Sequence, residues 1–340
     1  MSKLNKIDNE YRLNTENISK LDFVCDLCGS TVGTQRIHVR DALFSKAINQ
    51  FDIIKCNICG MCEMNPFPTI EDIKEIYQED SIFTKELENP YKQSLFFNIL
   101  QPLYLKYACI RRYSAKKCIQ LLNQKKSLQV FDIGCSSGIL LEAFDKIDSS
   151  IQSKGIDLDP DIIDKAKQKF KSRIIVGDFL ATEISQEFDA VTMCFVLEHV
   201  LDLNSYMQKA VSILKKNGIL FISVPDIDSP KAVQQKETWK LINDKRLKIG
   251  HVRWFNHRSI SVLAEKFGLE IEHICNIGES FFHFSQSKQK ILKSIFGMDQ
   301  TGERFIRSYT VRILYAIFVD YWLASKLSFG DCLYVFFRKK

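Results

Sequence analysis

Residues 130–144 read VFDIGCSSGILLEAF, and this stretch decides the fold. A short apolar and aromatic run carries Asp132, a Gly-x-Ser-x-Gly turn follows, and an apolar-periodic run starts at once. The pattern predicts a buried strand, a tight turn and the first turns of a helix. Gly134 and Gly138 lack a Cβ atom, so a ligand can lie against the turn and the N-terminus of the helix.

The spacing within the turn indicates which ligand it binds. A dinucleotide-binding turn has small residues at its first, third and sixth positions, which here are Gly134, Ser136 and Ile139. The large side chain of Ile139 does not suit that pattern. Two glycines four residues apart, after Asp132, suit instead a pocket that receives the methionine part of S-adenosylmethionine.

Five motifs of the chain resemble, in order, those of class I S-adenosylmethionine-dependent methyltransferases: residues 130–138, GIDLDP at 155–160, VGDF at 176–179, FDAVTMC with VLEHV at 188–200, and LKKNGILFISVP at 214–225. The resemblance implies that Asp157 accepts the ribose hydroxyls and that Asp178 meets the adenine amino group. Ser136 departs from the family's usual glycine and is small enough to fit. The cofactor-binding residues expected from the resemblance are Asp132, Gly134, Cys135, Ser136, Gly138, Asp157, Leu158, Asp178, Phe179 and Cys194.

From residue 128 onward, strand-like and helix-like segments alternate. Strands are predicted at residues 128–133, 153–156, 173–176, 190–195 and 219–224, and helices at 139–146, 161–170, 203–214 and 259–267. This alternation predicts an α/β fold, a doubly wound sheet with ligands at the carboxyl ends of its strands. Two further strands, at 269–277 and 331–337, complete the seven-stranded sheet that the resemblance implies, as a closing hairpin whose last strand is antiparallel.

Four cysteines near the start of the chain form two C-x-x-C-Gly knuckles. Cys25 and Cys28 precede Cys56 and Cys59 by a segment rich in β-forming residues, which predicts a hairpin between the knuckles. Four thiolates close a tetrahedron around one zinc ion, and a filled coordination sphere makes that zinc structural rather than catalytic. The alternative is two reduced pairs without metal. Cys62 is a spare thiol that the knuckle pattern disfavours as a ligand.

The length of 340 residues and the hydrophobic content of 46% allow more than one domain. We expect a flexible arm at 1–22, a zinc-binding ribbon at 23–68, a helical linker or cap at 69–126 with Thr69 as N-cap, and the methyltransferase domain at 127–340. We expect a helical insert at 278–330, with three alternative roles: packing against the domain, dimerisation, or contact with a membrane surface. Eleven cysteines without a secretory signal indicate a reducing cytoplasm, and no apolar run is long enough to span a bilayer.

Catalytic groups are expected just past the fourth and fifth strands. Glu198 and His199 follow the fourth strand, and His251 lies in the HVRWFN segment after the fifth. A histidine can remove a proton from an alcohol or amine acceptor, although each of these residues can also serve only to shape the pocket.

The acceptor is expected to be an anionic small molecule. Residues 230–258 are rich in lysine and arginine and are predicted to overhang the site as a lid, in which Trp239 and Trp254 either stack on the acceptor or anchor the lid. The order of ribbon and methyltransferase domain resembles bacterial methyltransferases of deoxysugars and surface-polysaccharide precursors, which implies a sugar nucleotide or glycan precursor. The alternatives are an RNA or protein methyltransferase with the ribbon as docking module, which no dense basic stripe supports, and a catalytically silent binding protein.

Overall fold

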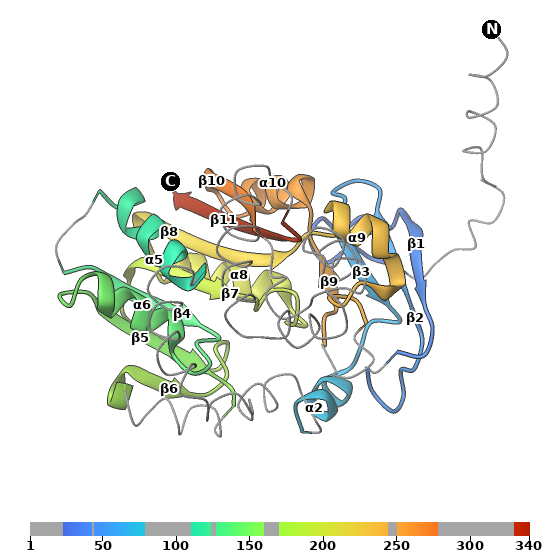
Figure 1. The fold of residues 1–340 in the computed structure, drawn as a ribbon, viewed down its shortest axis with the longest axis horizontal. Helices are drawn as coiled ribbons and strands as arrows, with labels where there is room; N and C mark the ends of the chain where they lie inside the picture. Colours follow the sequence, from blue (N-terminus) through green and yellow to red (C-terminus); the bar gives the residue numbers. More distant parts are fainter. Residues whose placement is uncertain are drawn as a thin grey trace, which may run out of the picture.

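The computed structural model describes residues 23–42, 44–78, 110–123, 127–159, 170–243, 250–277 and 330–340. Two sheets organise these residues: a large mixed sheet and a smaller sheet at its side (Figure 1). Across the described segments, no helix combines the length and the apolar character that crossing a membrane requires. The predicted arm at 1–22, almost all of the insert at 278–330 and most of the predicted helix at 161–170 lie outside them.

The large sheet has seven strands in the order β10-β11-β8-β7-β4-β5-β6. The five strands from β6 to β8 are parallel, whereas β11 is antiparallel to both β8 and β10. This confirms the predicted doubly wound sheet and its closing hairpin. The strands are β4 (Gln129–Ile133), β5 (Gln152–Asp157), β6 (Ile174–Val176), β7 (Phe188–Cys194), β8 (Leu214–Pro225), β10 (Leu269–Ile277) and β11 (Cys332–Lys339).

Helices cover both faces of the large sheet, because alternate strand residues point to opposite faces. Val335 packs in a core shared with α8 (Leu203–Ser212) and α10 (His257–Lys266), while its neighbour Phe336 packs with α5 (Ile110–Leu121) and α6 (Ile139–Ile147). The remaining short helices are α2 (Ile70–Gln78), α9 (Pro230–Gln235), η3 (Lys171–Arg173) and η4 (Lys236–Thr238).

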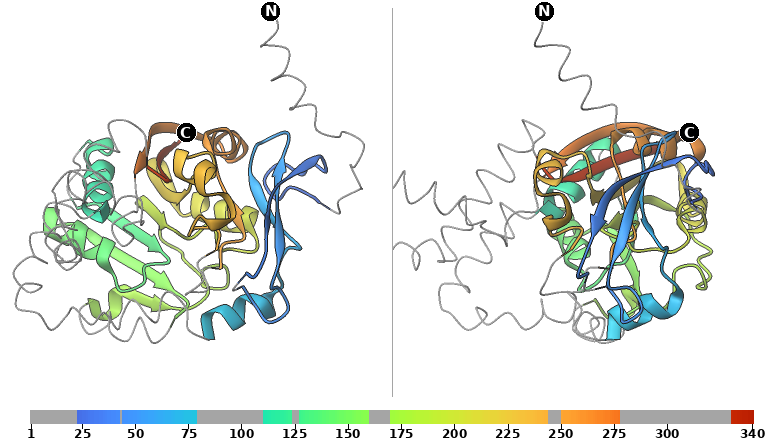
Figure 2. Two further views of the ribbon diagram at one scale, coloured as in Figure 1. Left: turned by 45° about the vertical axis from the view of Figure 1, so that its right-hand side comes forward. Right: turned by 90° about the vertical axis from the view of Figure 1, so that its right-hand side faces the viewer.

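The small sheet has the order β1-β2-β3-β9 and is formed by β1 (Gly33–Val39), β2 (Phe51–Cys56), β3 (Cys62–Asn65) and β9 (Arg253–Trp254). The antiparallel pair β1 and β2 is the hairpin predicted between the cysteine knuckles. Its fourth strand comes from the segment after β8, so the two sheets are joined through the chain as well as side by side (Figure 2). A separate core lies against this sheet and contains Phe51, Trp239 and Trp254.

Most predicted elements within the described segments are found within a few residues of their expected bounds. Thr69 caps α2 as predicted: its hydroxyl accepts from the Asp72 N–H at 3.2 Å, and its own N–H donates to the Asp72 carboxylate at 2.9 Å. The main difference is at β8, which begins at Leu214 rather than at the predicted residue 219. The Lys-Lys-Asn-Gly run predicts a turn at 214–218, and the chain does turn here, as a bulge within β8. Leu214 pairs with Phe188 and Ile219 with Ala190, so residues 215–218 have no partner on β7, and Asn217 has a φ angle of +61°.

Candidate active site and metal centre

The turn after β4 is fastened to the neighbouring strand β5. The N–H groups of Gly134 and Cys135 both donate to the Ile156 carbonyl, at 2.9 and 3.1 Å. Gly134 and Gly138 have φ angles of +70° and +77°. A Cβ atom at Gly134 would lie 2.5 Å from Val196, and one at Gly138 would lie 2.4 Å from the Phe170 ring. The backbone conformation and these close neighbours therefore require glycine, in addition to the ligand contact expected from the sequence.

Acidic side chains lie at the carboxyl ends of three adjacent parallel strands, β4, β5 and β6. Asp132 is buried and accepts a hydrogen bond from the Thr192 hydroxyl at 2.6 Å. Burial raises the pKa of Asp132 to about 7, the Thr192 hydroxyl and the charge of Arg111 oppose this shift, and the Asp157 carboxylate adds to it. Because the charge of Asp157 acts on Asp132, the ends of β4 and β5 bring these two carboxylates into one electrostatic neighbourhood.

The Asp157 carboxylate has the capacity that a ribose ligand requires. Its Oδ2 accepts the Ser136 N–H at 2.7 Å and its Oδ1 accepts the Asp159 N–H at 3.1 Å. A carboxylate has about four acceptor sites, so each oxygen can accept one more hydrogen bond, enough for two ribose hydroxyls. Asp178, at the end of β6, is exposed and accepts the Leu180 N–H at 2.8 Å.

Tyr206, which no sequence pattern singles out, lies at the same edge. Burial raises the pKa of the Tyr206 phenol to about 12, and the carboxylates of Asp178 and Asp157 add to the shift. Its ring centroid lies 5.5 Å from that of Phe179. Tyr206 belongs to α8, whose sequence shows only the periodicity of an amphipathic helix, and nothing in that pattern indicates which side chain reaches the sheet edge.

Three other residues expected to bind the cofactor, Leu158, Cys135 and Phe179, differ in how far their side chains are exposed. Leu158 is 58% exposed beside Asp157, so an apolar surface lies next to the acidic groups. The side chains of Cys135 and Phe179 are buried. A ligand at these two positions would therefore meet backbone atoms rather than side chains.

Arg111 of α5 is a second group at this edge that no sequence pattern singles out. It donates a hydrogen bond to the Cys194 thiol at the end of β7, and this thiol also lies 3.0 Å from the Ser223 hydroxyl. The Arg111 guanidinium lies 5.5 Å from the centre of the Phe195 ring. A permanent positive charge therefore stands at the carboxyl end of the sheet, where it also acts on the buried Asp132.

Glu198, His199 and His251 meet just past β7. The centroids of the His199 and His251 rings are 4.6 Å apart, and the rings form a T-shaped arrangement. His199 Nδ1 lies 3.1 Å from the Gly250 carbonyl and His251 Nδ1 lies 2.8 Å from the Leu241 carbonyl. A carbonyl oxygen only accepts, so we assign the proton to each Nδ1 and a lone pair to each Nε2.

These three residues suit either proton abstraction or cation binding. Burial lowers the pKa of His199 to about 4, and burial together with the His199 ring lowers that of His251 well below its usual value. Both rings are therefore neutral at physiological pH. One ligand atom from each of Glu198, His199 and His251 lies within 4.8 Å of the others, a set that could also hold a divalent cation.

Some basic side chains of residues 230–258 make contacts within the protein. Lys231 pairs with Asp331 at 2.5 Å, Arg253 is buried, and residues 244–249 lie outside the described segments. Trp239 and Trp254 are fully buried. Stacking of these tryptophans on an acceptor is wrong, because their rings fill the core beneath the small sheet. Their burial fits the other expected role, anchoring a lid, which stays a prediction because part of residues 230–258 lies outside the described segments.

The four knuckle cysteines converge on one point. The Sγ atoms of Cys25, Cys28, Cys56 and Cys59 all lie within 4.8 Å of one another, with Cys25 and Cys59 3.4 Å apart and Cys28 and Cys56 3.5 Å apart. A tetrahedral zinc site with Zn–S bonds of about 2.3 Å requires sulfur separations of about 3.8 Å, so the four sulfurs need only small shifts.

The surroundings of the sulfurs also suit a metal. Burial alone would raise the pKa of Cys56, but hydrogen bonds from the Cys59 and Ile58 N–H groups help to lower it overall. The neighbouring Cys59 thiol and burial raise the pKa of Cys25, because two thiolates this close need a cation to neutralise them. Cys62 lies outside the cluster and its thiol contacts Arg36 Nη1 at 3.9 Å. The residues therefore fit a zinc site with four cysteine ligands.

A family model described as a methyltransferase domain matches residues 107–274. This segment runs from the residues before α5 to within β10, and includes the three acidic strand ends and the residues of the Glu198, His199 and His251 cluster.

The chain is also similar to curated proteins. The ubiquinone biosynthesis O-methyltransferase of Pelagibacter ubique (strain HTCC1062) is 28% identical over 132 residues, 37% of this chain and 53% of that protein. The protein of the same name from Actinobacillus pleuropneumoniae serotype 7 is 31% identical over 137 residues, again 37% and 53%. The chain thus spans about half the length of the curated relatives it matches.

Among solved structures, a putative sarcosine dimethylglycine methyltransferase from Galdieria sulphuraria has a TM-score of 0.44 and 14% identity, covering 68% of this chain and 85% of that one. The N-methyltransferase NodS from Bradyrhizobium japonicum, in complex with S-adenosyl-L-homocysteine, has a TM-score of 0.40 and 17% identity, covering 67% and 86%.

Proposed function

We propose that this chain is a class I S-adenosylmethionine-dependent methyltransferase that methylates a small-molecule acceptor. The order of strands in its large sheet and the match of a methyltransferase-domain model over residues 107–274 support the proposal. One observation carries the proposal: Asp132, Asp157 and Asp178 lie at the ends of three adjacent strands. The charge of Asp157 acts on Asp132, and the charges of Asp157 and Asp178 act on Tyr206 of α8. Acidic acceptors beside a glycine turn suit a nucleoside that carries hydroxyls, an amino group and a positive charge.

The residues of the site take distinct parts in holding the cofactor. The spare acceptor capacity of Asp157 suits the ribose hydroxyls, and the exposed Asp178 suits the adenine amino group. The apolar face of Leu158 suits the purine ring, and the turn at residues 134–138 suits the methionine part. When bound, S-adenosylmethionine supplies a methyl group that is already activated, so alignment of the acceptor is the main remaining task of the protein.

We further propose a hydroxyl group as the acceptor, in a sugar nucleotide or another anionic precursor. The name of the curated relatives supports transfer to oxygen, and the net charge of +6 and Arg111 at the strand ends favour an anion. A hydroxyl must lose its proton during transfer. We assign this proton to the Nε2 lone pair of His199 or His251, whose ring centroids lie 4.6 Å apart, and repulsion between two charged rings limits the pair to one proton.

Calorimetry with S-adenosylmethionine tests the cofactor assignment. Asp157→Asn should weaken binding by roughly 10- to 100-fold, because it removes the charge from the hydrogen bonds to ribose. The matched control is Asp148→Asn: Asp148 also accepts a backbone N–H, from Ser150 at 2.9 Å, but it follows α6 at the opposite edge of the sheet. The control should bind as the wild type does. Wild-type protein that binds no S-adenosylmethionine would leave the silent binding protein as the better interpretation.

The acceptor class requires a separate experiment. Sugar-nucleotide and polysaccharide pools from cells with and without the gene should differ by the mass of one methylene group in a single component. An RNA acceptor would instead give binding that weakens steeply with salt, because each phosphate contact releases counterions. A steep salt dependence with no change in the sugar pools would overturn the small-molecule proposal.

A further inference from the structure

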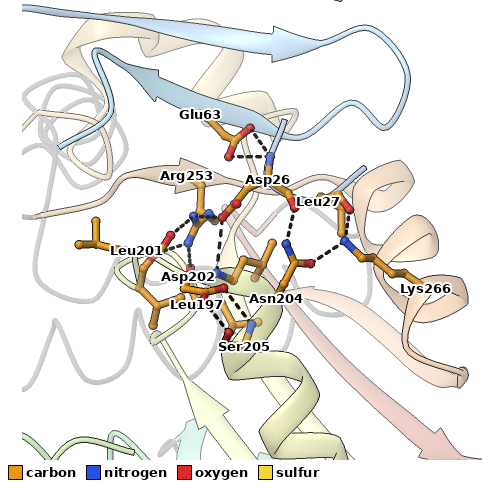
Figure 3. Close-up of polar contacts among 12 residues, drawn as sticks. Asp26, Leu27, Glu63, Leu197, Leu201, Asp202, Asn204, Ser205, Arg253 and Lys266 are labelled. Carbon is orange, nitrogen blue, oxygen red and sulfur yellow. Dashed lines mark hydrogen bonds and ion pairs between the residues drawn. The ribbon is translucent and has the colours of Figure 1, made fainter. Parts of the chain in front are cut away.

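The first cysteine knuckle is joined through Arg253 to the loop at residues 197–201, the loop that includes Glu198 and His199 (Figure 3). Asp26 lies between the two cysteines of this knuckle, and its backbone carbonyl accepts from the Asn204 side chain at 2.7 Å. The neighbouring Leu27 carbonyl accepts from Lys266 Nζ at 2.6 Å. The knuckle backbone is thus held by side chains of α8 and α10, the helices that cover the same face of the large sheet.

Arg253 links the Asp26 carboxylate to the loop at residues 197–201. Its Nη2 donates to Asp26 Oδ2 at 2.7 Å and to the Leu201 carbonyl at 3.3 Å, while its Nη1 donates to the Leu197 carbonyl at 3.3 Å and to the Val200 carbonyl. One fully buried guanidinium therefore holds carbonyls on both sides of Glu198 and His199. No lysine could make these contacts, because they need the planar fork of the guanidinium.

The strand that carries Arg253 makes the same connection through its backbone. The Val252 N–H donates to the Glu198 carbonyl at 2.8 Å, and the Val252 carbonyl accepts from the Met64 N–H of β3 at 2.9 Å. His251 is the next residue before Val252, so the placement of both candidate histidines depends on this segment. The contacts run without a gap from the small sheet to the proposed acceptor site.

The position of Asp26 depends on the knuckle staying closed. Its backbone N–H donates to the buried Glu63 carboxylate at 3.2 Å, and Cys25 and Cys28 on either side belong to the common sulfur cluster. If the four thiolates move apart, Asp26 moves with them. Arg253 would then lose its direct ion pair and keep only the weaker attraction of the Glu63 and Asp202 carboxylates, which is a costly state for a buried cation, and the loop would lose part of its support.

We propose that the four-cysteine site is a positioning device for the acceptor side of the active site, and that Arg253 is the positioning residue which transmits knuckle closure, through Asp26, to the loop carrying Glu198 and His199. The catalytic consequence rests on the proposed function. The coupling between knuckle and loop does not, because it follows from the contacts alone. Binding of S-adenosylmethionine at β4, β5 and β6 should be independent of it.

Hydrogen exchange on the full chain tests the coupling without any acceptor. Removing zinc with a chelator should make the amides of residues 197–203 exchange at least about tenfold faster, while those of β4 and β5 keep their protection. Opening of the knuckle amides without any change at 197–203 would overturn the proposal. It would equally be overturned if the zinc-loaded and stripped proteins differed nowhere, since the cluster would then impose no constraint.

Two variants keep the test valid if the stripped protein unfolds. Asp26→Asn and Arg253→Lys should retain one zinc per chain by elemental analysis and bind S-adenosylmethionine within about twofold of the wild type. Residues 197–203 should exchange faster in both, and kcat should fall by about 10- to 100-fold as the loop loses its alignment. The matched control is Arg338→Lys, in which Arg338 also holds two carbonyls, of Asn217 and Leu121 at 3.0 Å each, away from the small sheet.

The outcomes separate this inference from the proposed function. Unchanged exchange at 197–203 in both variants, or the same change in the Arg338→Lys control, would overturn the coupling even if methyl transfer is active. Failure of the wild type to bind S-adenosylmethionine would overturn the proposed function, whereas faster loop exchange in the two variants would still support the coupling.

Discussion

The buried ring of His199 predicts how the free energy of unfolding depends on pH. Its pKa is about 4 in the folded protein, where burial disfavours the charged ring, and about 6.5 when unfolded. Above pH 6.5 the ring is neutral in both states, and His199 adds no pH dependence there. Between pH 6.5 and 4 the unfolded chain binds more protons, so the free energy of unfolding falls as the pH falls, by about 2 kcal/mol at pH 5.

Urea unfolding of wild type and His199→Gln at pH 7.5 and pH 5 measures this contribution. The variant should lose about 2 kcal/mol less than the wild type on going to pH 5, because glutamine does not titrate. Comparing the two proteins at each pH cancels the effects of groups that do not interact with His199, including acid release of zinc. His251 is the exception, because the His199 ring lowers its pKa. Equal losses in both proteins would show that His199 is not held neutral by the fold.

At the residue scale, spacing along the chain is informative for some groups and not for others. Asp157 and Asp178 directly follow predicted strands, and the carboxyl ends of parallel strands share one edge, so periodicity alone indicates that they meet. Tyr206 and Arg111 reach the same edge from helices, where the outcome depends on how the helix is rotated against the sheet. The pattern of apolar residues does not fix that rotation closely enough.

At the scale of the element, the packing of the two-residue strand β9 predicts how much Trp254 contributes to stability. Trp254 is fully buried, its ring stacks on Phe51 with centroids 6.5 Å apart, and its Nε1 donates to the Leu241 carbonyl at 2.7 Å. Trp254→Ala should lower the free energy of unfolding of the zinc-loaded chain by about 3–5 kcal/mol, since it leaves a large cavity between the small sheet and residues 239–242.

Trp254→Phe is the matched variant for this prediction. It keeps most of the packing and removes one hydrogen-bond donor, so it should cost only about 1–3 kcal/mol. Urea titrations followed by circular dichroism give both values. A loss below about 1 kcal/mol for Trp254→Ala would mean that β9 is not needed to hold the small sheet in place.

Elements also differ in how well the sequence predicts them. Strands β4 and β7 lie within two residues of their predicted bounds, because central strands buried on both faces have continuous apolar runs. No sequence pattern predicts β9. Two residues carry no periodicity, and β9 exists only because β3 offers an edge where Cys62 and Glu63 pair with Trp254 and Arg253. Such an element arises from tertiary contact rather than from local preference.

At the scale of the whole molecule, the ribbon and the large sheet share one core. Phe23, Leu27 and Ile54 of the small module belong to the same buried cluster as Leu203 and Leu263 of the helices on the large sheet. The sequence predicts a ribbon and a domain in succession. It does not predict this continuity, because contacts between distant segments leave no periodic signal in either of them.

A shared core predicts that the two modules unfold together. Trp239 and Trp254 report on the core beneath the small sheet, whereas far-ultraviolet circular dichroism reports mainly on the large sheet and its helices. The chain has three tryptophans, and Trp322→Phe removes the one that lies outside the described segments. In that background, the fluorescence and circular dichroism signals should follow one urea transition.

Removing zinc gives the sharpest test of whether the two modules unfold together. Because a metal that binds only the folded state stabilises it by mass action, stripping zinc should lower the free energy of unfolding by several kcal/mol. With a shared core, the fluorescence and circular dichroism transitions should move to lower urea by the same amount and stay coincident. Cys56→Ser should have the same effect without a chelator, because it removes one of the four proposed ligands.

The control for zinc removal is Cys118→Ser, at a buried cysteine of α5 outside the cluster, which should leave the effect of the chelator intact. A fluorescence transition that moves alone, ahead of an unchanged circular dichroism transition, would show that the small sheet unfolds independently. The contacts through Arg253 and β9 would then be too weak to join the modules. Coincident movement would instead mean that the free energy of metal binding at the cysteine cluster stabilises the large sheet, which carries the proposed cofactor site.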